Sequence, residues 1–178
     1  MQARGLLMIE HRLIERMLSA LQGALSQIES RRKVDPVLVD TAVDFIKVYA
    51  DRTHHGKEED ILFRELEKKA LPAEERRVMA ELIQEHVFGR QTTQALIAAN
   101  ARYRTGDLKA LKDIAQSLKT LIDFYPKHIE KEDKIFFPKA RAYFSVEEDQ
   151  AMLARFYEFD RRLIHEKYKQ VVESLEKS

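Results

Sequence analysis

Two stretches of the sequence decide the fold: HHGKEEDILF at residues 54–63 and HIEKEDKIFF at residues 128–137. When the second is laid on the first, His128 matches His54, Glu132 matches Glu58, and a lysine, an isoleucine and a phenylalanine also recur at equal positions. Each copy has a His and a Glu four residues apart, which a helix places on one face, one above the other. The apolar residues that follow direct this face toward a core. The repeat therefore predicts two facing helices that each bring an imidazole and a carboxylate to one metal site.

Length and composition limit the class of protein. The 178 residues, of which 44% are hydrophobic, suit one domain with a sizeable core. There is no cysteine, so disulfides, thiol catalysis and Cys-ligated metal sites are excluded within this chain. The small numbers of glycine (5) and proline (4) favour long helices over a sheet with many turns.

The distribution of charge and hydropathy indicates where the protein works. Acidic and basic residues are mixed along the chain with a net charge of +1, so we expect no nucleic-acid partner and no membrane partner. The sequence shows no secretory signal, and no apolar run approaches the roughly 18 residues of a membrane span. We therefore expect a cytoplasmic protein.

Apolar residues at three- and four-residue spacing predict five helices. They cover about residues 6–29, 36–69, 73–104, 108–138 and 146–176. Asp35 followed by Pro36 predicts the start of the second helix. Ser145 and Glu148 predict a capping box at the start of the fifth helix. The apolar stripe of the fifth helix consists of Met152, Phe156, Phe159, Leu163 and Val171.

Three residues that disfavour helices lie inside these segments. Pro126 lacks a backbone donor, which predicts a kink or a short break just before His128. Pro138 is expected to end the fourth helix. Gly56 is a weaker helix former than alanine by about 1 kcal/mol, and it would allow another element to pack closely against the backbone.

Four of the six histidines lie one per helix, on or beside the apolar face, and two of them have a Glu four residues later. Imidazole and carboxylate suit iron, manganese and zinc, and helical bundles build metal sites from residues on facing helices. The two Glu residues could each bridge two ions, so that each ion would have two His. Without a cation, carboxylates buried in a core are unfavourable unless something pairs with them. The candidate metal ligands are His11, His54, Glu58, His86, His128 and Glu132.

A second pair, His55 and Glu59, has the same spacing and competes with the first pair. The repeat favours the first pair, because the residue after His128 is Ile129 and not a second His. Asp133 and its charged neighbours in the second stretch are expected to face solvent. The two other histidines are therefore left outside the candidate site, His165 as a structural or surface residue.

The order of these motifs resembles the hemerythrin-like HHE cation-binding family. The residues that carry the resemblance are Glu10-His11, residues 54–59, Glu85-His86 with Gly89-Arg90, and residues 128–133, and it covers about residues 6–140. It implies an all-α protein, an up-and-down four-helix bundle (hemerythrin-like) with a non-haem di-iron site held by the six candidate ligands. The cofactor would be two iron ions with an oxo or hydroxo bridge, or zinc or manganese instead. Residues 1–178 would form a single domain, the bundle with an additional C-terminal helix at about 146–176.

Two features differ from the oxygen-carrying hemerythrins. Arg90 stands where those proteins have a second His on the third helix, and Glu132 replaces a shorter bridging acid. We expect the lost imidazole to leave the second ion more open, which speaks against reversible oxygen carriage. The resemblance then implies a protein that binds, senses or reacts with a small ligand (oxygen, nitric oxide or peroxide) or handles iron.

Two other hypotheses compete with this one. The first is a metal-stabilised regulatory or interaction module without redox chemistry, in which the fifth helix binds a protein partner or a second copy as a homodimer. The second is a zinc or mononuclear site without a redox role. The residue pattern leaves open whether the protein is an enzyme.

Overall fold

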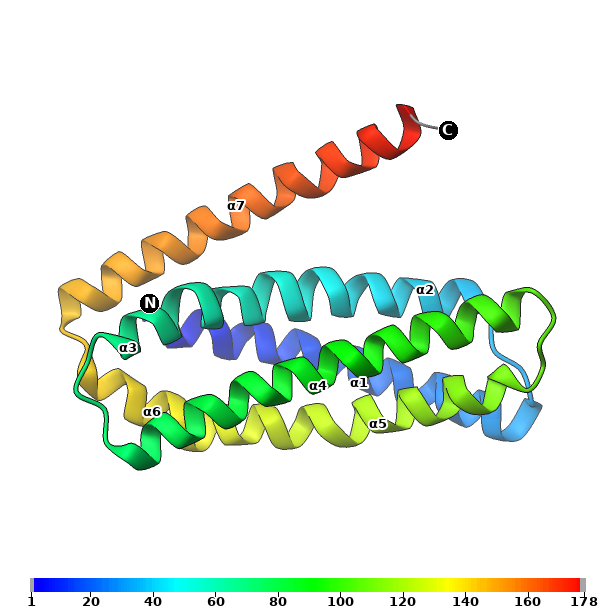
Figure 1. Cartoon of the computed structure of the whole chain (residues 1–178), viewed down its shortest axis with the longest axis horizontal. Coiled ribbons are helices and arrows are strands. Elements are labelled where there is room, and N and C mark those ends of the chain that lie inside the picture. Colours follow the sequence, from blue (N-terminus) through cyan, green and yellow to red (C-terminus); the bar gives the residue numbers. More distant parts are fainter. Residues whose placement is uncertain (1, 177–178) are drawn as a thin grey trace.

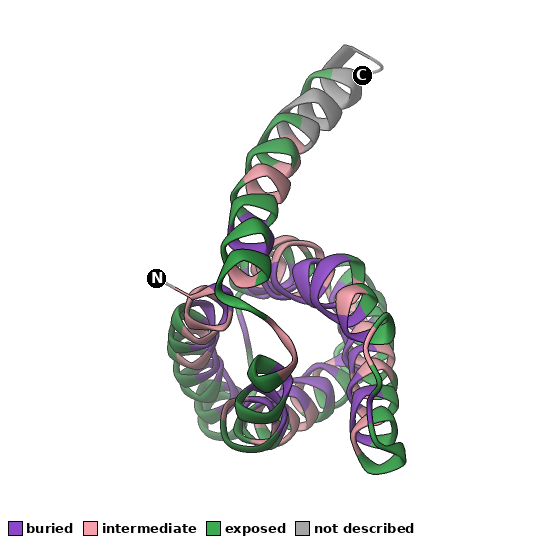
Figure 2. Ribbon diagram, turned by 90° about the vertical axis from the view of Figure 1, so that its left-hand side faces the viewer, coloured by how far each residue is buried: buried purple, intermediate pink, exposed green. Residues whose placement is uncertain are grey.

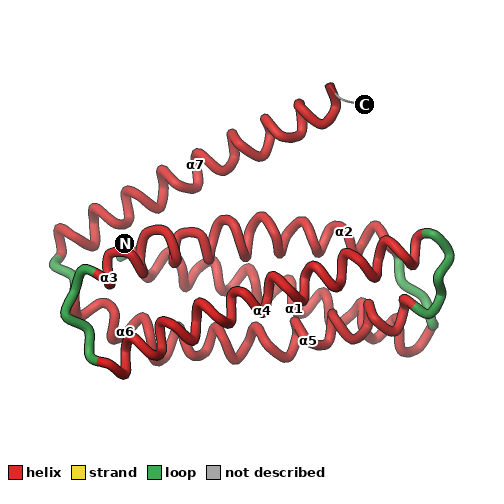
Figure 3. The backbone as a smooth tube through the Cα atoms, in the orientation of Figure 1, coloured by secondary structure: helices red, strands yellow, loops and turns green. Residues whose placement is uncertain are grey.

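The computed structural model describes residues 2–176, apart from the side chains of residues 166, 168–171 and 173–176. The described residues form helices and loops and contain no strand, so the predicted all-α class is confirmed. Four long helical segments lie side by side, and a fifth runs away from them at an angle (Figure 1). Short loops join the segments at the two ends of this bundle (Figure 3).

The five predicted helices are present, although two of them are composite. The first segment is α1 (Ala3–Arg31), the third is α4 (Ala73–Arg104) and the fifth is α7 (Val146–Glu176). The second segment consists of α2 (Pro36–Phe45), the π-helical stretches η1 (Ile46–His55) and η2 (Glu58–Phe63), and α3 (Arg64–Glu67). The fourth consists of α5 (Ala110–Lys131), the π-helical η3 (Glu132–Phe136), α6 (Phe137–Ala140) and the 3-10 turn η4 (Arg141–Tyr143).

Two helix starts have the caps that the sequence predicts. The Asp35 side chain accepts a hydrogen bond from the backbone N–H of Val37 at 2.9 Å. At the start of α7 the Ser145 hydroxyl accepts from the N–H of Glu148 at 3.2 Å, and the Glu148 carboxylate accepts from the N–H of Ser145 at 2.9 Å. These bonds satisfy backbone donors that a helix start leaves unpaired.

The short break predicted before His128 and the helix end predicted at Pro138 are both wrong. The helix α5 passes through Pro126 without a break and continues to Lys131. Burial of Tyr125 and Ile129 on its inner face outweighs the cost of about 3 kcal/mol for a proline in a helix interior. Pro138 does not end the fourth segment, because it lies in the first turn of α6, where a missing N–H costs nothing.

The apolar core has two parts, with polar residues between them. One part includes Leu18, Leu21, Val39, Leu96 and Leu118, and the other includes Leu7, Leu62, Phe63, Leu82 and Phe137. On each of the first four segments the two parts occupy opposite ends, and the buried residues face inward (Figure 2). The candidate ligands lie between the two parts, so the core holds them in place from both ends.

The helix α7 packs apolar residues on the bundle through its first half, and farther along Lys167 donates to Asp44 of α2 at 2.9 Å. Phe156 is fully buried, and the ring of Phe159 lies against Gly56, where an added Cβ would be 2.8 Å from its Cζ atom. The expected close packing at Gly56 is thereby confirmed. Farther along α7, Ile164 is 59% exposed, and the side chain of Val171 lies outside the described residues. Within the described part of the chain, no helix is long and apolar enough to cross a membrane.

Replacing Gly56 with alanine is expected to destabilise the protein by about 1 kcal/mol. Alanine favours a helix over glycine by about 1 kcal/mol, but overpacking against Phe159 typically costs about 1–3 kcal/mol and outweighs this gain. In a Phe159→Ala background the same substitution should instead stabilise the protein. Denaturant unfolding of the four proteins in a double-mutant cycle measures this change of sign. The same sign in both backgrounds would mean that α7 does not pack on Gly56 in solution.

Candidate metal centre

Seven polar side chains meet between the two parts of the core. His11 comes from α1, His54 and His55 from η1, Glu58 from η2, His86 from α4, His128 from α5 and Glu132 from η3. Each of the seven residues is at most 2% exposed. The structure therefore brings together all six residues that the sequence singles out, and it adds His55.

The seven side chains divide into two sets. The first set is His11, His54, Glu58 and Glu132, and the second is His55, His86 and His128; within each set the ligand atoms lie within 4.8 Å of one another. Glu58 connects the sets, since its Oε1 is 3.5 Å from Nε2 of His54 and its Oε2 is 3.4 Å from Nε2 of His86. Glu132 does the same, with 3.1 Å to Nε2 of His11 and 3.3 Å to Nε2 of His128. Each carboxylate thus turns one oxygen to each set, which is the placement of a bridging ligand.

The inward atoms have no hydrogen-bond partner among the described residues. This holds for Nε2 of His11, His54, His86 and His128 and for all four oxygens of Glu58 and Glu132. Leaving a buried polar group unpaired costs about 1–3 kcal/mol. Imidazole nitrogens and carboxylate oxygens are the donors that iron, zinc and manganese bind. The residues present therefore fit two metal ions.

His55 is the inward residue that the sequence prediction missed. In an α-helix, neighbouring residues point about 100° apart, so only one of His54 and His55 would face the centre. The π-helical hydrogen bonds of η1 run from i to i+5 and put more residues in each turn, so both imidazoles face inward. The ring of His55 stacks on His86 with 3.9 Å between centroids.

This arrangement corrects two expectations. The sets hold two and three imidazoles rather than two each. If both sets hold an ion, His55 would replace the imidazole that is missing at Arg90, and the reason for a more open second ion no longer holds. The sequence does contain a signal for His55, since Asp51 precedes it by four residues and so lies on the same helix face. In the structure, Oδ1 of Asp51 is 3.4 Å from Nδ1 of His55.

Carboxylates outside the centre bind the opposite nitrogen of four imidazoles. Nδ1 of His54 pairs with Glu10 at 2.9 Å, that of His86 with Glu59 at 2.7 Å, that of His128 with Glu85 at 2.8 Å and that of His11 with Asp133 at 2.8 Å. The carboxylate on each helical segment thus binds the His of the next segment, and the carboxylate on the fourth segment binds the His of the first. We call these four bonds the carboxylate ring. With Nδ1–H donated outward, the Nε2 lone pair points to the centre, as in metal-bound histidines.

A layer of cations lies behind the carboxylate ring. Glu10 accepts from Lys57, Asp133 from Arg12, Glu85 from Lys131, and Glu59 from Arg90 at 2.7 Å. The prediction that Asp133 faces solvent is wrong, because it binds both His11 and Arg12. Burial raises the pKa of Glu10, Glu59 and Glu85, but their bonds to His and to these cations lower it below its usual value. These three carboxylates are therefore ionised at neutral pH.

The comparison with protein families agrees with this geometry. The family model described as the hemerythrin HHE cation binding domain matches residues 3–140, which include all seven inward residues. The chain belongs to the hemerythrin family.

Curated relatives of this hemerythrin domain carry no functional name. The chain is 24% identical over 156 residues to "Uncharacterized protein Rv1995" of Mycobacterium tuberculosis and, equally, to "Uncharacterized protein Mb2018" of Mycobacterium bovis. The aligned part is 88% of this chain, and the chain spans about 60% of the length of these relatives. No solved structure matches the chain.

The centre of the hemerythrin domain has strongly shifted pKa values when no cation is bound. Burial and the charge of Glu132 raise the pKa of Glu58 well above its usual value. Burial opposes the ionisation of Glu132 too, but the neighbouring His128 and His11 lower its pKa. His11 is also buried, yet its bond to Asp133 and the nearby Glu132 carboxylate raise its pKa to about 9. The metal-free centre therefore holds protons that bound ions would displace.

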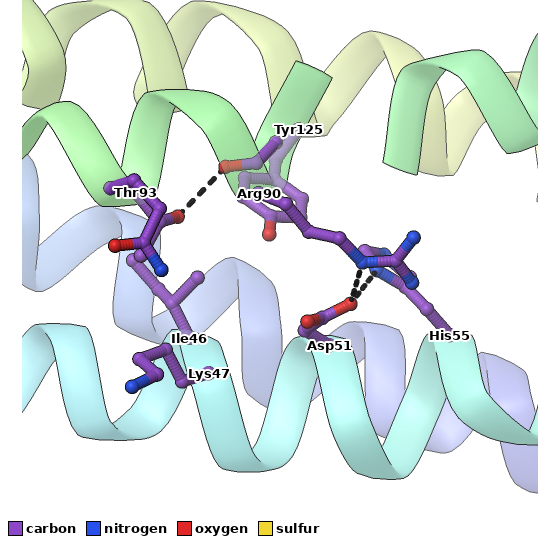
Figure 4. A pocket seen from close by; sticks show the side chains of 9 residues that line it. Ile46, Lys47, Asp51, His55, Arg90, Thr93 and Tyr125 are labelled. Carbon is purple, nitrogen blue, oxygen red and sulfur yellow. Dashed lines mark hydrogen bonds and ion pairs between the residues drawn. The ribbon is translucent and has the colours of Figure 1, made fainter. Parts of the chain in front are cut away.

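A small cavity of about 60 Å³ lies beside the second set of ligands. Its wall includes His55, Asp51, Arg90, Thr93 and Tyr125. Figure 4 shows Arg90 bonded to Asp51 next to His55, with 2.7 Å between Nε and Oδ1. Since about 10–15 Å³ holds one water, this cavity has room for a few waters or a small ligand.

Proposed function

We propose that this hemerythrin domain binds two iron ions and that it binds, senses or reacts with a small ligand such as oxygen, nitric oxide or peroxide, or handles iron. The proposed ligands are His11, His54, His55, Glu58, His86, His128 and Glu132. The observation that carries the proposal is the position of Glu58 and Glu132, each with one unpaired oxygen toward each set of imidazoles. The cavity beside His55 supports a ligand of only a few atoms.

The composition of the donor sets favours iron over structural zinc. Structural zinc sites are almost always closed, with four ligands. Here the second set offers three imidazoles and one oxygen from each bridging carboxylate, which exceeds four donors. When bound, a pair of iron ions supplies redox chemistry and an open position for a ligand. The chain's own part is to hold the imidazoles through the carboxylate ring and to exclude water from the centre.

We also propose that the first four segments form an up-and-down four-helix bundle over about residues 6–140. Together with α7 they would make a single domain, located in the cytoplasm. The loops that join neighbouring segments at alternate ends support this topology (Figure 3).

The test is the metal content and the optical spectrum of the protein from iron-replete cells. We expect close to two irons per chain and a near-ultraviolet charge-transfer band that changes when nitric oxide, peroxide or oxygen is added to the reduced protein. The zinc-loaded protein is the control and should show neither the band nor the response. Zinc, a single ion or no metal in the purified protein would overturn the di-iron proposal.

The second candidate is a metal-stabilised interaction module without redox chemistry. The distal part of α7 favours it, because Ile164 is 59% exposed on a helix that leaves the bundle (Figure 1). In that case iron-loaded protein would show no response to the small ligands, and removal of the metal would change its association with a partner or a second copy.

A further inference from the structure

The helix α7 lies outside the part of the chain that matches the hemerythrin family, yet it contacts the helix that carries the centre. Its Asp160 carboxylate accepts hydrogen bonds from Nζ of Lys57 at 2.7 and 3.0 Å. The ring of Phe159, the residue before Asp160, packs against Gly56. Gly56 and Lys57 lie between the inward histidines of η1 and the inward Glu58 of η2. Thus α7 touches the chain at the centre of the proposed ligand set.

A continuous series of polar contacts leads from α7 to the centre. Lys57, which Asp160 binds, also donates to Glu10. Glu10 in turn binds Nδ1 of His54 at 2.9 Å, and the other ring nitrogen of His54 faces Glu58. Three bonds therefore separate a residue of α7 from an imidazole of the first set.

Lys57 differs from the other cations behind the carboxylate ring. Its side chain is 0% exposed, whereas those of Arg12, Arg90 and Lys131 are 55%, 37% and 27% exposed. Solvent can reorganise around an exposed cation, but a fully buried ammonium depends on the protein for its partners. The position of Lys57, and with it that of Glu10, is therefore more sensitive to the loss of one partner than are the other three pairs.

We infer that Asp160 is a positioning residue for the metal centre: it holds Lys57 against Glu10 and so fixes the orientation of His54. This inference rests on the proposed function, since it concerns how firmly the centre holds metal. It also predicts an effect in the other direction. Coupling between two equilibria is reciprocal, so metal that is held better with α7 in place must also hold α7 more firmly.

The experiment compares Asp160→Asn with Asp149→Asn and with the unmodified full chain. Asp149 is a matched control, because it also joins α7 to the bundle, through the N–H of Ala3 at 3.3 Å, but it makes no contact with the centre. Loss of a residue bonded directly to a metal ligand typically weakens metal binding about 10–100-fold, and Asp160 lies two bonds farther out, so the lower end of this range is expected. We expect Asp160→Asn to weaken Fe²⁺ binding about tenfold in anaerobic competition with a chelator, Asp160→Glu to restore most of the loss, and Asp149→Asn to have no effect.

Hydrogen exchange of the α7 backbone supplies the second readout. Fe²⁺ should slow exchange at residues 150–160 in the unmodified chain and in Asp149→Asn, but not in Asp160→Asn. If the Asp160 and Asp149 variants behaved equally in both measurements, the inference would be overturned. The helix α7 would then pack on the bundle without affecting metal binding. If the unmodified chain bound no Fe²⁺ at all, the proposed function itself would fail, and the two failures are thereby distinguished.

Discussion

Replacing Glu58 with methionine is expected to abolish binding of both ions and yet to make the metal-free protein more stable. Glu58 is 0% exposed, both of its oxygens lack a hydrogen-bond partner among the described residues, and burial raises its pKa. A buried polar group without a hydrogen-bond partner costs about 1–3 kcal/mol, and an apolar side chain of similar volume removes this cost. Each set loses one carboxylate oxygen at the same time, so both proposed ions have one donor fewer and only Glu132 is left to bridge them.

The measurements are metal content and urea unfolding of the metal-free protein. The neighbouring Glu59→Met is the matched control, because Glu59 is paired with His86 and Arg90, both at 2.7 Å. Its removal leaves Nδ1 of the buried His86 without its partner and takes one of two carboxylates from Arg90, which still binds Asp51, so Glu59→Met should destabilise the metal-free protein. Opposite signs for adjacent glutamates are the expected outcome. Two ions retained in Glu58→Met would show that Glu58 is not a bridging ligand, and a destabilised metal-free variant would show that the buried Glu58 carboxyl is not an unfavourable group.

His55→Ala is expected to halve the metal content, from two ions per chain to one. His55 belongs to the set that also holds His86 and His128, and it has no part in the first set. Loss of His55 leaves a vacant position in a set built for five donors, so the second ion should be released to a chelator, while the first ion loses no donor. Elemental analysis after dialysis against a weak chelator measures the difference.

Two substitutions control this experiment. His165→Ala removes an exposed histidine of α7, which the sequence predicts to be a structural or surface residue, and should leave two ions. His54→Ala removes a ligand of the first set and should release that ion instead. If His55→Ala retained two ions, His55 would not be a ligand. It would then be a neighbour of the centre, as the sequence repeat predicts.

The sequence predicts the inward face of the centre well, for a geometric reason. A spacing of four residues places His54 beside Glu58 and His128 beside Glu132 on any regular helix, and each pair is followed by apolar residues that bury it. Composition alone excludes cysteine chemistry and favours helices over strands. The structure adds how far these residues are buried and which oxygen faces which imidazole.

What could not be predicted depends on contacts between segments far apart in the sequence. The π-helical turns that bring in His55 need hydrogen bonds that no local propensity reports. Glu10, Glu85 and Asp133 each stand next to an inward residue of their own helix, where a charge is ordinarily solvated. Their partners lie on the following segment, and only the packed bundle pairs them.

The carboxylate ring has a consequence for how the helices are set about their own long axes. Each of the four segments both gives a carboxylate and receives one, so a rotation of any single helix breaks bonds with two neighbours at once. Because the four bonds form a closed ring, the rotation of each helix about its own axis is fixed by its two neighbours. The imidazoles are therefore already aimed before an ion arrives, and little of the binding free energy is spent on reorganising the protein.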